Sequence, residues 1–268
     1  MYNIIMKTNI LSIFAIAAIA LIMLIPFPGA LLDILLAVNL LLAAFFFFMT
    51  GCAKKITFFY SIPGVLIFNT IFSLITQVFS TRLILIKGTG FDGRLIRTLS
   101  SVISGSNGIT GLVVDSALFI GLLLLLVTVI SRQARRISET AARFTLDAIP
   151  GRQMAIDAAM SSGSISGEEA QAQKKDLQRD ADFYGVMDGA SEFIAGFLKL
   201  GLLVIAISIT GGIAIGALLQ GEDIIGAIEI YVPLSVAAGV LAQIPVLLAS
   251  IAIGNIVTRN LLIARKPG

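Results

Sequence analysis

Long apolar stretches constrain this chain more than any other feature. A helix needs about 20 apolar residues to cross the hydrocarbon core of a membrane. Six stretches of roughly that length occur, at 9–25, 31–49, 58–79, 112–130, 193–219 and 230–257. Only 13% of the 268 residues are charged, whereas a soluble domain has about 25%. The sequence therefore predicts an all-α fold, a polytopic transmembrane helical protein, with the third span interrupted at Pro63-Gly64.

The composition excludes several kinds of catalytic site. The chain has no His, no Trp and a single Cys. A Ser-His-Asp triad, an intrachain disulfide and a cysteine-based metal cluster are therefore impossible within it. It also contains no Walker motif and no carboxylate pair with a metal partner. We expect a protein that is not an enzyme and that needs neither a cofactor nor a metal.

Charge divides the chain into three parts. Residues 1–131 hold spans 1–4, with a Gly- and Ser-rich segment at 80–111 that is expected to be interfacial or re-entrant. Residues 132–192 form a polar insert, predicted to be a small helical cytoplasmic segment between spans 4 and 5. Residues 193–268 hold spans 5 and 6 and a basic tail.

The polar insert has charges at helical spacing. Arg136, Arg143 and Asp147 follow one another at intervals of seven and four, which places them near one helix face. We expect Arg143 either to pair with Asp147 or to reach a neighbouring subunit. Pro150-Gly151 is expected to end this helix. A second, short soluble helix is predicted at 166–182, with Ser166 as its N-cap.

Basic residues also predict the orientation. With six spans, Lys7, the Lys54-Lys55 loop, the insert and the Arg259 tail fall on one side of the membrane. Such loops are normally cytoplasmic, so both termini are expected in the cytoplasm. Four basic residues between 82 and 97 fall on the other side. Either an amphipathic helix lying in the interface or an error in the number of spans would explain them.

Three charged residues lie in or near the apolar spans. They are Asp33, Asp115 and Lys199. A charge at the bilayer centre costs about 2.5–3.5 kcal/mol on insertion scales, so all three are candidates for ion coupling. Each is also close to a span end, where its charge reaches the headgroups at low cost. The small residues from Gly211 to Gly216 are typical of close helix–helix contact.

Several motifs resemble one known family. The string RISETAARFTLDAIPGRQMAIDA at 136–158 is similar to the signature of the FHIPEP family, the export-gate proteins of flagellar and virulence type III secretion. LLDILLAVNL, STRLILI, ADFYGVMDGAS, AQIPVLL and GNIVTRN agree with the family in order and spacing. The resemblance extends over most of the chain, from about residue 26 to residue 260.

The resemblance implies a function and a set of partners. It implies a homo-oligomeric ring, a nonamer in the family, in the bacterial inner membrane, with other export-apparatus subunits and secreted proteins as partners. The ring would couple the proton motive force to protein export. The basic residues lie beside spans in a lipid bilayer, so no nucleic acid is expected. The resemblance assigns assembly and gating roles to Arg82, Arg136, Arg143, Asp147, Arg152, Asp157, Asp182 and Asp188.

The sequence also departs from the family pattern. Glu192 and Ala195 stand at basic positions, and Phe197 stands where the family has Asp. Ala237-Ala238-Gly239 replaces Gly-Asp-Gly, and Ser73 replaces an Arg. Two alternatives to an ion-coupled export gate therefore stay open. One is a structural gate subunit or fragment that does not conduct protons. The other is a stand-alone ion transporter, against which the absence of internal repeats counts.

Overall fold

The computed structural model describes residues 28–52, 62–105 and 108–264, and everything in these ranges apart from short connections is helical. The predicted all-α fold is confirmed. The helices are α2 (Gly29–Cys52), α3 (Ile62–Lys87), the 3-10 turn η2 (Gly88–Gly90), α4 (Arg94–Ser104), α5 (Gly108–Ser161), α6 (Gly167–Leu219) and α7 (Ile224–Ala264). The predicted first span and the Lys54-Lys55 loop lie outside the described residues.

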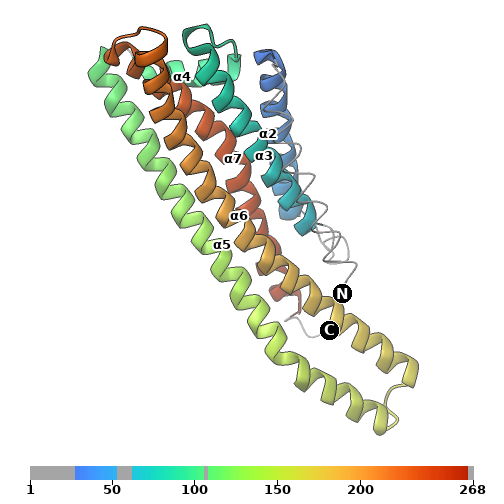
Figure 1. Ribbon diagram of the computed structural model, residues 1–268. Helices are drawn as coiled ribbons and strands as arrows, with labels where there is room; N and C mark the ends of the chain where they lie inside the picture. The colour runs from blue at the N-terminus through green and yellow to red at the C-terminus, as the bar shows by residue number, and fades with distance from the viewer. Residues whose placement is uncertain (1–27, 53–61, 106–107, 265–268) are drawn as a thin grey trace.

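The five long helices form one bundle (Figure 1). All five are long and apolar enough to cross a membrane, in agreement with five of the six predicted spans. α7 packs against α2, α3, α5 and α6, and it is the most buried of the five. α4 lies across one end of the bundle, against α7. The start of α5 and the turn from α6 to α7 lie at this same end (Figure 1).

The third predicted span differs from expectation at both ends. Pro63 does not interrupt α3, because it lies in the first turn, where a missing N–H breaks no intrahelical bond. The helix then continues past Phe79 to Lys87, with Ser80, Leu83 and Ile84 buried. Residues 80–87 therefore extend the third helix, and a separate amphipathic helix starts only at Arg94. That helix, α4, buries Ile96 and Ile103 and exposes Arg97.

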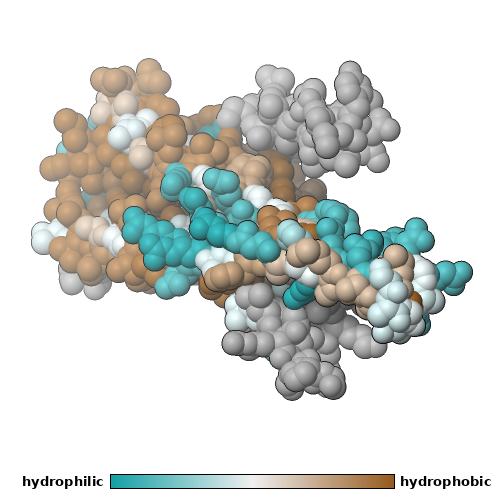
Figure 2. Space-filling model, turned by 90° about the horizontal axis from the view of Figure 1, so that it is seen from below, coloured by the Kyte–Doolittle hydropathy of each residue, from teal (hydrophilic) through white to brown (hydrophobic). Residues whose placement is uncertain are grey.

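The polar insert is continuous with the helices of the bundle. It consists of the extended ends of α5 and α6, which form a long antiparallel hairpin protruding from the bundle (Figure 1). The prediction that Pro150-Gly151 ends the helix is wrong, since α5 continues to Ser161. Pro150 is exposed, so water can solvate the carbonyl that loses its amide partner there. Figure 2 shows hydrophilic side chains gathered on the hairpin and hydrophobic ones on the bundle.

The start of α6 confirms one local prediction and corrects another. Ser166 caps the helix: its hydroxyl accepts from the Glu169 N–H at 3.1 Å, while the Glu169 carboxylate accepts from the Ser166 N–H at 2.9 Å. This capping box satisfies two backbone donors that the first turn leaves without partners. The helix does not end near residue 182, however, but continues without interruption to Leu219.

Small residues allow close approach between α6 and α7. A Cβ atom at Gly212 or Gly216 would collide with the ring of Tyr231, which is fully buried. The predicted packing role of the Gly211–Gly216 stretch is therefore confirmed for two of its glycines. The packing leaves two apolar clusters, one at each half of the bundle, which hold the helices at fixed positions.

Candidate functional site

Asp33, the first ion-coupling candidate, belongs to α2, and its side chain contacts the first turn of α4. Its two carboxylate oxygens accept hydrogen bonds from the backbone N–H groups of Arg94 (2.8 Å) and Leu95 (3.0 Å). The N-cap residue of α4 is Gly93, which has no side chain for this purpose. Asp33 on α2 therefore caps α4 from outside, where a negative charge also favours the helix dipole.

Asp92 makes the reverse connection. Its carboxylate accepts from the backbone N–H of Gly29, at the start of α2, at 3.3 Å, and it pairs with Lys87 at 2.7 Å. The hydrogen bond from Lys87 holds the pKa of Asp92 below its ordinary value, and burial opposes this only in part. Asp33 of α2 thus holds the N-terminus of α4, and Asp92, just before α4, holds the N-terminus of α2.

Asp115 lies at the same end of the bundle as Asp33. A Cβ atom at Gly105, just after α4, would come within 2.7 Å of its carboxylate. The third candidate, Lys199 of α6, lies opposite residues 127–139 of α5. The middle of that stretch is about 25 Å along α5 from Asp115. The three ion-coupling candidates therefore do not form one site.

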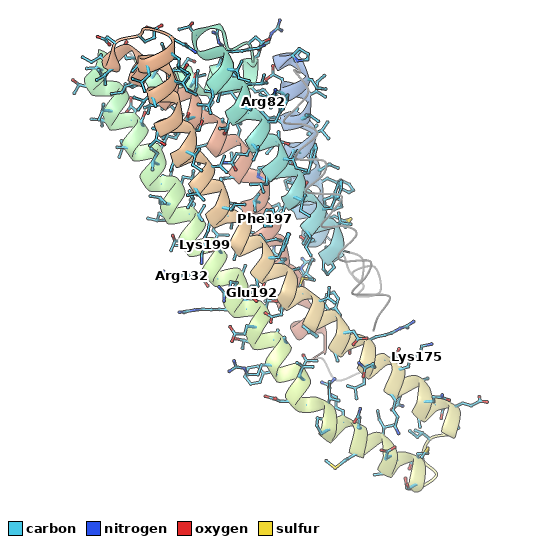
Figure 3. The ribbon with its side chains drawn as sticks, viewed as in Figure 1. Arg82, Arg132, Lys175, Glu192, Phe197 and Lys199 are labelled. Atoms are coloured by element: carbon cyan, nitrogen blue, oxygen red, sulfur yellow. The ribbon has the colours of Figure 1, made fainter. Side chains whose placement is uncertain are left out.

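Arg82 faces a largely apolar groove between α3 and α6. Val78, Leu85, Val204 and Ile207 line the groove with it. Arg82 is half-buried there, and Figure 3 shows it far from the labelled charges of α5 and α6. Its neighbours are membrane-facing side chains, so it is not part of the charged hairpin.

A hollow of about 450 Å³ opens between α5 and α6 at the level of Lys199. Arg132, Arg135, Arg136 and Glu139 line it from α5, together with Lys199 and Ala195 from α6. Figure 3 shows Arg132 and Lys199 at nearly the same level of the bundle. The sequence marked Lys199 and Arg136 but missed Arg132 and Arg135, although their position directly after an apolar span was a usable signal.

The charge pattern of the α5 extension corrects a prediction. Arg143 pairs with Glu139 at 2.9 Å, in the direction of the membrane, rather than with Asp147. Both residues are four positions away, so the spacing alone did not distinguish them. Asp147 is exposed and makes no hydrogen bond or ion pair within the described chain. Contact of either residue with a neighbouring subunit stays a prediction.

Other charged candidates connect the two arms of the hairpin. Asp157 pairs with Lys174 across the hairpin at 2.6 Å. Burial raises the pKa of Asp180 on α6, and the nearby charge of Arg152 on α5 opposes this in part. Lys174 and Asp180 were not singled out from the sequence, because their partners lie on a different helix.

The last two candidates are acidic residues of α6. Asp182 accepts a hydrogen bond from the Gln178 side chain at 2.9 Å, within the same helix. Asp188 is half-buried, and the charges that act on it are Glu139, Glu192 and Arg135. Asp188 therefore lies beside the hollow, whereas Asp182 lies further along the hairpin.

Several buried polar side chains form hydrogen bonds inside the apolar bundle. The Gln77 side chain donates to the carbonyl of Gly201 at 2.7 Å, and Gln243 approaches the carbonyl of Leu198 at 3.4 Å. Ser73, at a position where the family has Arg, shares two hydrogen bonds with Asn39. Gln77 was missed from the sequence, because a lone Gln in an apolar stretch does not indicate its partner.

The family departures on α6 and α7 also have defined surroundings. Phe197 lies against Phe193, with ring centroids 4.4 Å apart. Ala237 and Ala238 are buried in an apolar cluster, and a Cβ at Gly239 would collide with Ile205. Apolar packing therefore occupies the positions where the family pattern has acidic side chains.

Comparison with known proteins agrees with these motifs. The FHIPEP family model matches residues 19–265. The flagellar biosynthesis protein FlhA of Borreliella burgdorferi is 45% identical over 236 residues, which are 88% of this chain and 34% of that protein. FlhA of Bacillus subtilis is 41% identical over 255 residues (95% and 37%), and FlhA of Salmonella typhimurium is 39% identical over 240 residues (88% and 34%).

The match covers most of this chain but only part of each relative. This chain spans about a third of the length of these relatives, although they cover nearly all of it. No solved structure matches it. The family model covers the helical bundle together with the charged hairpin, so the chain belongs to the FHIPEP family.

Proposed function

We propose that this chain is the membrane part of a flagellar protein-export apparatus in the bacterial inner membrane. The observation that carries the proposal is the match to FlhA proteins, which extends over the bundle and the hairpin together. A virulence-type apparatus is the other branch that the family resemblance implies, and the relatives named above favour the flagellar one. The role is one of transport and assembly rather than catalysis.

The orientation follows from the basic residues. The hairpin, the hollow and Arg259 bring most of the Lys and Arg residues to one end of the bundle. The other end has Asp33, Asp92, Glu222 and Asp223. By the positive-inside rule the hairpin lies in the cytoplasm. α4 lies flat across the outer end, which accommodates Arg94 and Arg97 at that interface.

Assembly into a ring is supported by exposed apolar side chains on the hairpin. Phe144 is 68% exposed and Met154 is 67% exposed, although both belong to the segment that lies outside the bundle. Side chains of this kind on a cytoplasmic segment are suited to contacts between neighbouring copies. The exposed apolar faces of α2 and α5 within the bundle face lipid or the next subunit.

The surroundings of the membrane residues support a structural, assembling gate subunit more directly than they support a proton-conducting one. Asp33 uses both oxygens to cap α4. Phe197, Ala237 and Ala238 remove the acidic groups of the family pattern from the membrane region. A structural gate subunit is therefore the second candidate function. A stand-alone transporter is disfavoured, because the cytoplasmic hairpin retains the family signature.

Two experiments test these proposals. Co-purification from native membranes measures whether the chain is bound to the other membrane subunits of the export apparatus. Its absence from that complex would remove the export proposal. Proton flux in reconstituted vesicles, compared with Asp33→Asn, distinguishes coupling from a structural role. Flux that depends on Asp33 supports coupling, and a chain in the complex without flux supports the structural gate.

A further inference from the structure

The hollow between α5 and α6 lies where two apolar helix surfaces end together. α5 has no charged residue between Asp115 and Arg132, and α6 has none between Lys199 and its end at Leu219. Val127 and Leu202 therefore form the apolar wall of the hollow, while Arg136 and Glu139 form its polar wall. A hollow at this level opens to the acyl chains on one side and to the headgroups on the other.

The lining has a large excess of positive charge. Arg132, Arg135, Arg136 and Lys199 contribute four cations, and Glu139 is the one carboxylate among the lining residues. Glu139 already pairs with Arg143, which lies outside the hollow. Within the described chain, Arg132, Arg136 and Lys199 make no hydrogen bond or ion pair. Three of the four cations thus have no internal acceptor, whereas Arg135 acts on Asp188 beside the hollow.

The chemistry of the lining defines the ligand. Guanidinium groups bind phosphate oxygens through paired, charge-assisted hydrogen bonds. The Thr128 and Ser131 side chains add hydroxyl groups beside the apolar wall. A volume of about 450 Å³ is in the usual range for a small-molecule site. A ligand with an anionic group and apolar chains would contact both the polar and the apolar wall, whereas a free anion would contact only the polar wall.

We propose that this hollow binds the phosphate headgroup of an anionic phospholipid, with its acyl chains along Val127 and Leu202. Arg132 and Lys199 hold the headgroup from the two helices, and Glu139 limits the positive charge. This gives Lys199 a binding role in place of ion coupling. The inference rests on the hollow itself and stands whether or not the export proposal holds.

The test uses purified protein in nanodiscs of phosphatidylcholine, with or without phosphatidylglycerol, and native mass spectrometry to count bound phosphatidylglycerol. A charge-assisted hydrogen bond to a phosphate oxygen contributes about tenfold or more, so the Arg132→Gln/Lys199→Gln variant is expected to bind about 100-fold more weakly. Glu139→Gln is expected to bind more tightly, because it removes the one carboxylate among the lining residues.

Arg259→Gln is the matched control. Arg259 is exposed in a different groove, which it shares with Gln133 of α5, so it lies at about the same level as the hollow. It is expected to weaken phosphatidylglycerol binding by about fivefold or less, since it removes a general surface charge and not a site. Lys175→Gln, far along the hairpin (Figure 3), is expected to change nothing.

Several results would overturn the proposal. A loss of about 25-fold or less in the double variant, as for two general surface charges, would mean that only the general surface charge attracts the lipid. Unchanged binding in the double variant would exclude the hollow. Thermal stabilisation by inorganic phosphate equal to that by phosphatidylglycerol would exclude a lipid-specific site. A change of oligomeric state in the double variant without loss of lipid would assign the hollow to a second copy of the chain.

Discussion

The side-chain amide of Gln77 donates a 2.7 Å hydrogen bond to the backbone carbonyl of Gly201, within the apolar bundle. The side-chain amide of Gln243 on α7 also packs against this glycine. Three helices therefore meet at a point where one of them has no side chain. A helical carbonyl exposed in this way is available as an acceptor only because Gly201 leaves space for two amide side chains.

Gly201→Ala is expected to destabilise the bundle. The added methyl group would overlap the Gln243 amide and lie 2.9 Å from Gln77 Oε1. Overpacking of this kind costs about 1–3 kcal/mol, which thermal unfolding in detergent measures as a lower midpoint. Gly196→Ala on the same helix is the control, because a Cβ there meets nothing within 4 Å. An equal loss in both variants would mean that Gly201 has no special role.

Asp33→Ala is expected to loosen α4 without disrupting the bundle. It removes both side-chain acceptors of the first turn, a change that costs about 0.5–2 kcal/mol. Asp33→Asn keeps an oxygen acceptor and is expected to retain most of that stability. Hydrogen exchange at Arg94 and Leu95 reports the difference directly. Fast exchange in Asp33→Asn equal to that in Asp33→Ala would contradict the capping role.

Helix existence followed directly from the sequence, whereas helix ends did not. Apolar length alone located the described spans, because burying a backbone in lipid demands helices. Proline was the misleading signal. Pro63 and Pro150 are both inside helices, since one is in a first turn and the other is exposed to water. Local chemistry predicts a break there, and only the surroundings decide whether one occurs.

The candidate site was predictable in part for the same reason. The hairpin charges stand in a continuous motif, so the sequence shows them together. The partners of Asp33 and Asp157 lie on other helices, at Arg94 and Lys174, and Arg132 lines the hollow opposite Lys199. Such pairings depend on helix register and rotation, which hydropathy does not specify. The choice of Glu139 over Asp147 by Arg143 likewise depends on side-chain geometry and not on spacing.

The Asp92–Lys87 pair predicts acid sensitivity at the end of the bundle where α4 lies. The pKa of Asp92 is below the ordinary value of 3.8, chiefly through the hydrogen bond from Lys87. A carboxylate with a lowered folded-state pKa stabilises the protein above its unfolded-state pKa and loses this contribution as the pH falls through the folded-state value. We therefore expect the stabilisation to be complete at neutral pH and to disappear below 3.8.

Asp92→Asn and Lys87→Gln test this pH dependence. Both should flatten the acid limb of a plot of unfolding midpoint against pH, since each removes the charged hydrogen bond. Asp223→Asn at the same end is the control, because the Asp223 carboxylate accepts only from the N–H of Gly226, in its own turn. A steep acid limb that survives in Asp92→Asn would assign the sensitivity to another group.

Ser166→Ala is expected to fray the tip of the hairpin. It removes the hydroxyl that accepts from Glu169 and leaves that N–H without its partner, at a cost of about 1 kcal/mol. Limited proteolysis should then cut faster near residues 162–170, while the bundle midpoint stays unchanged. Ser162→Ala is the control, because the Ser162 hydroxyl bonds only to Ala159, in the last turn of α5, and to Ser164 in the loop, and does not cap α6. If both variants are cut at the wild-type rate, the Asp157–Lys174 pair and the packing between the two helices hold the tip without the cap.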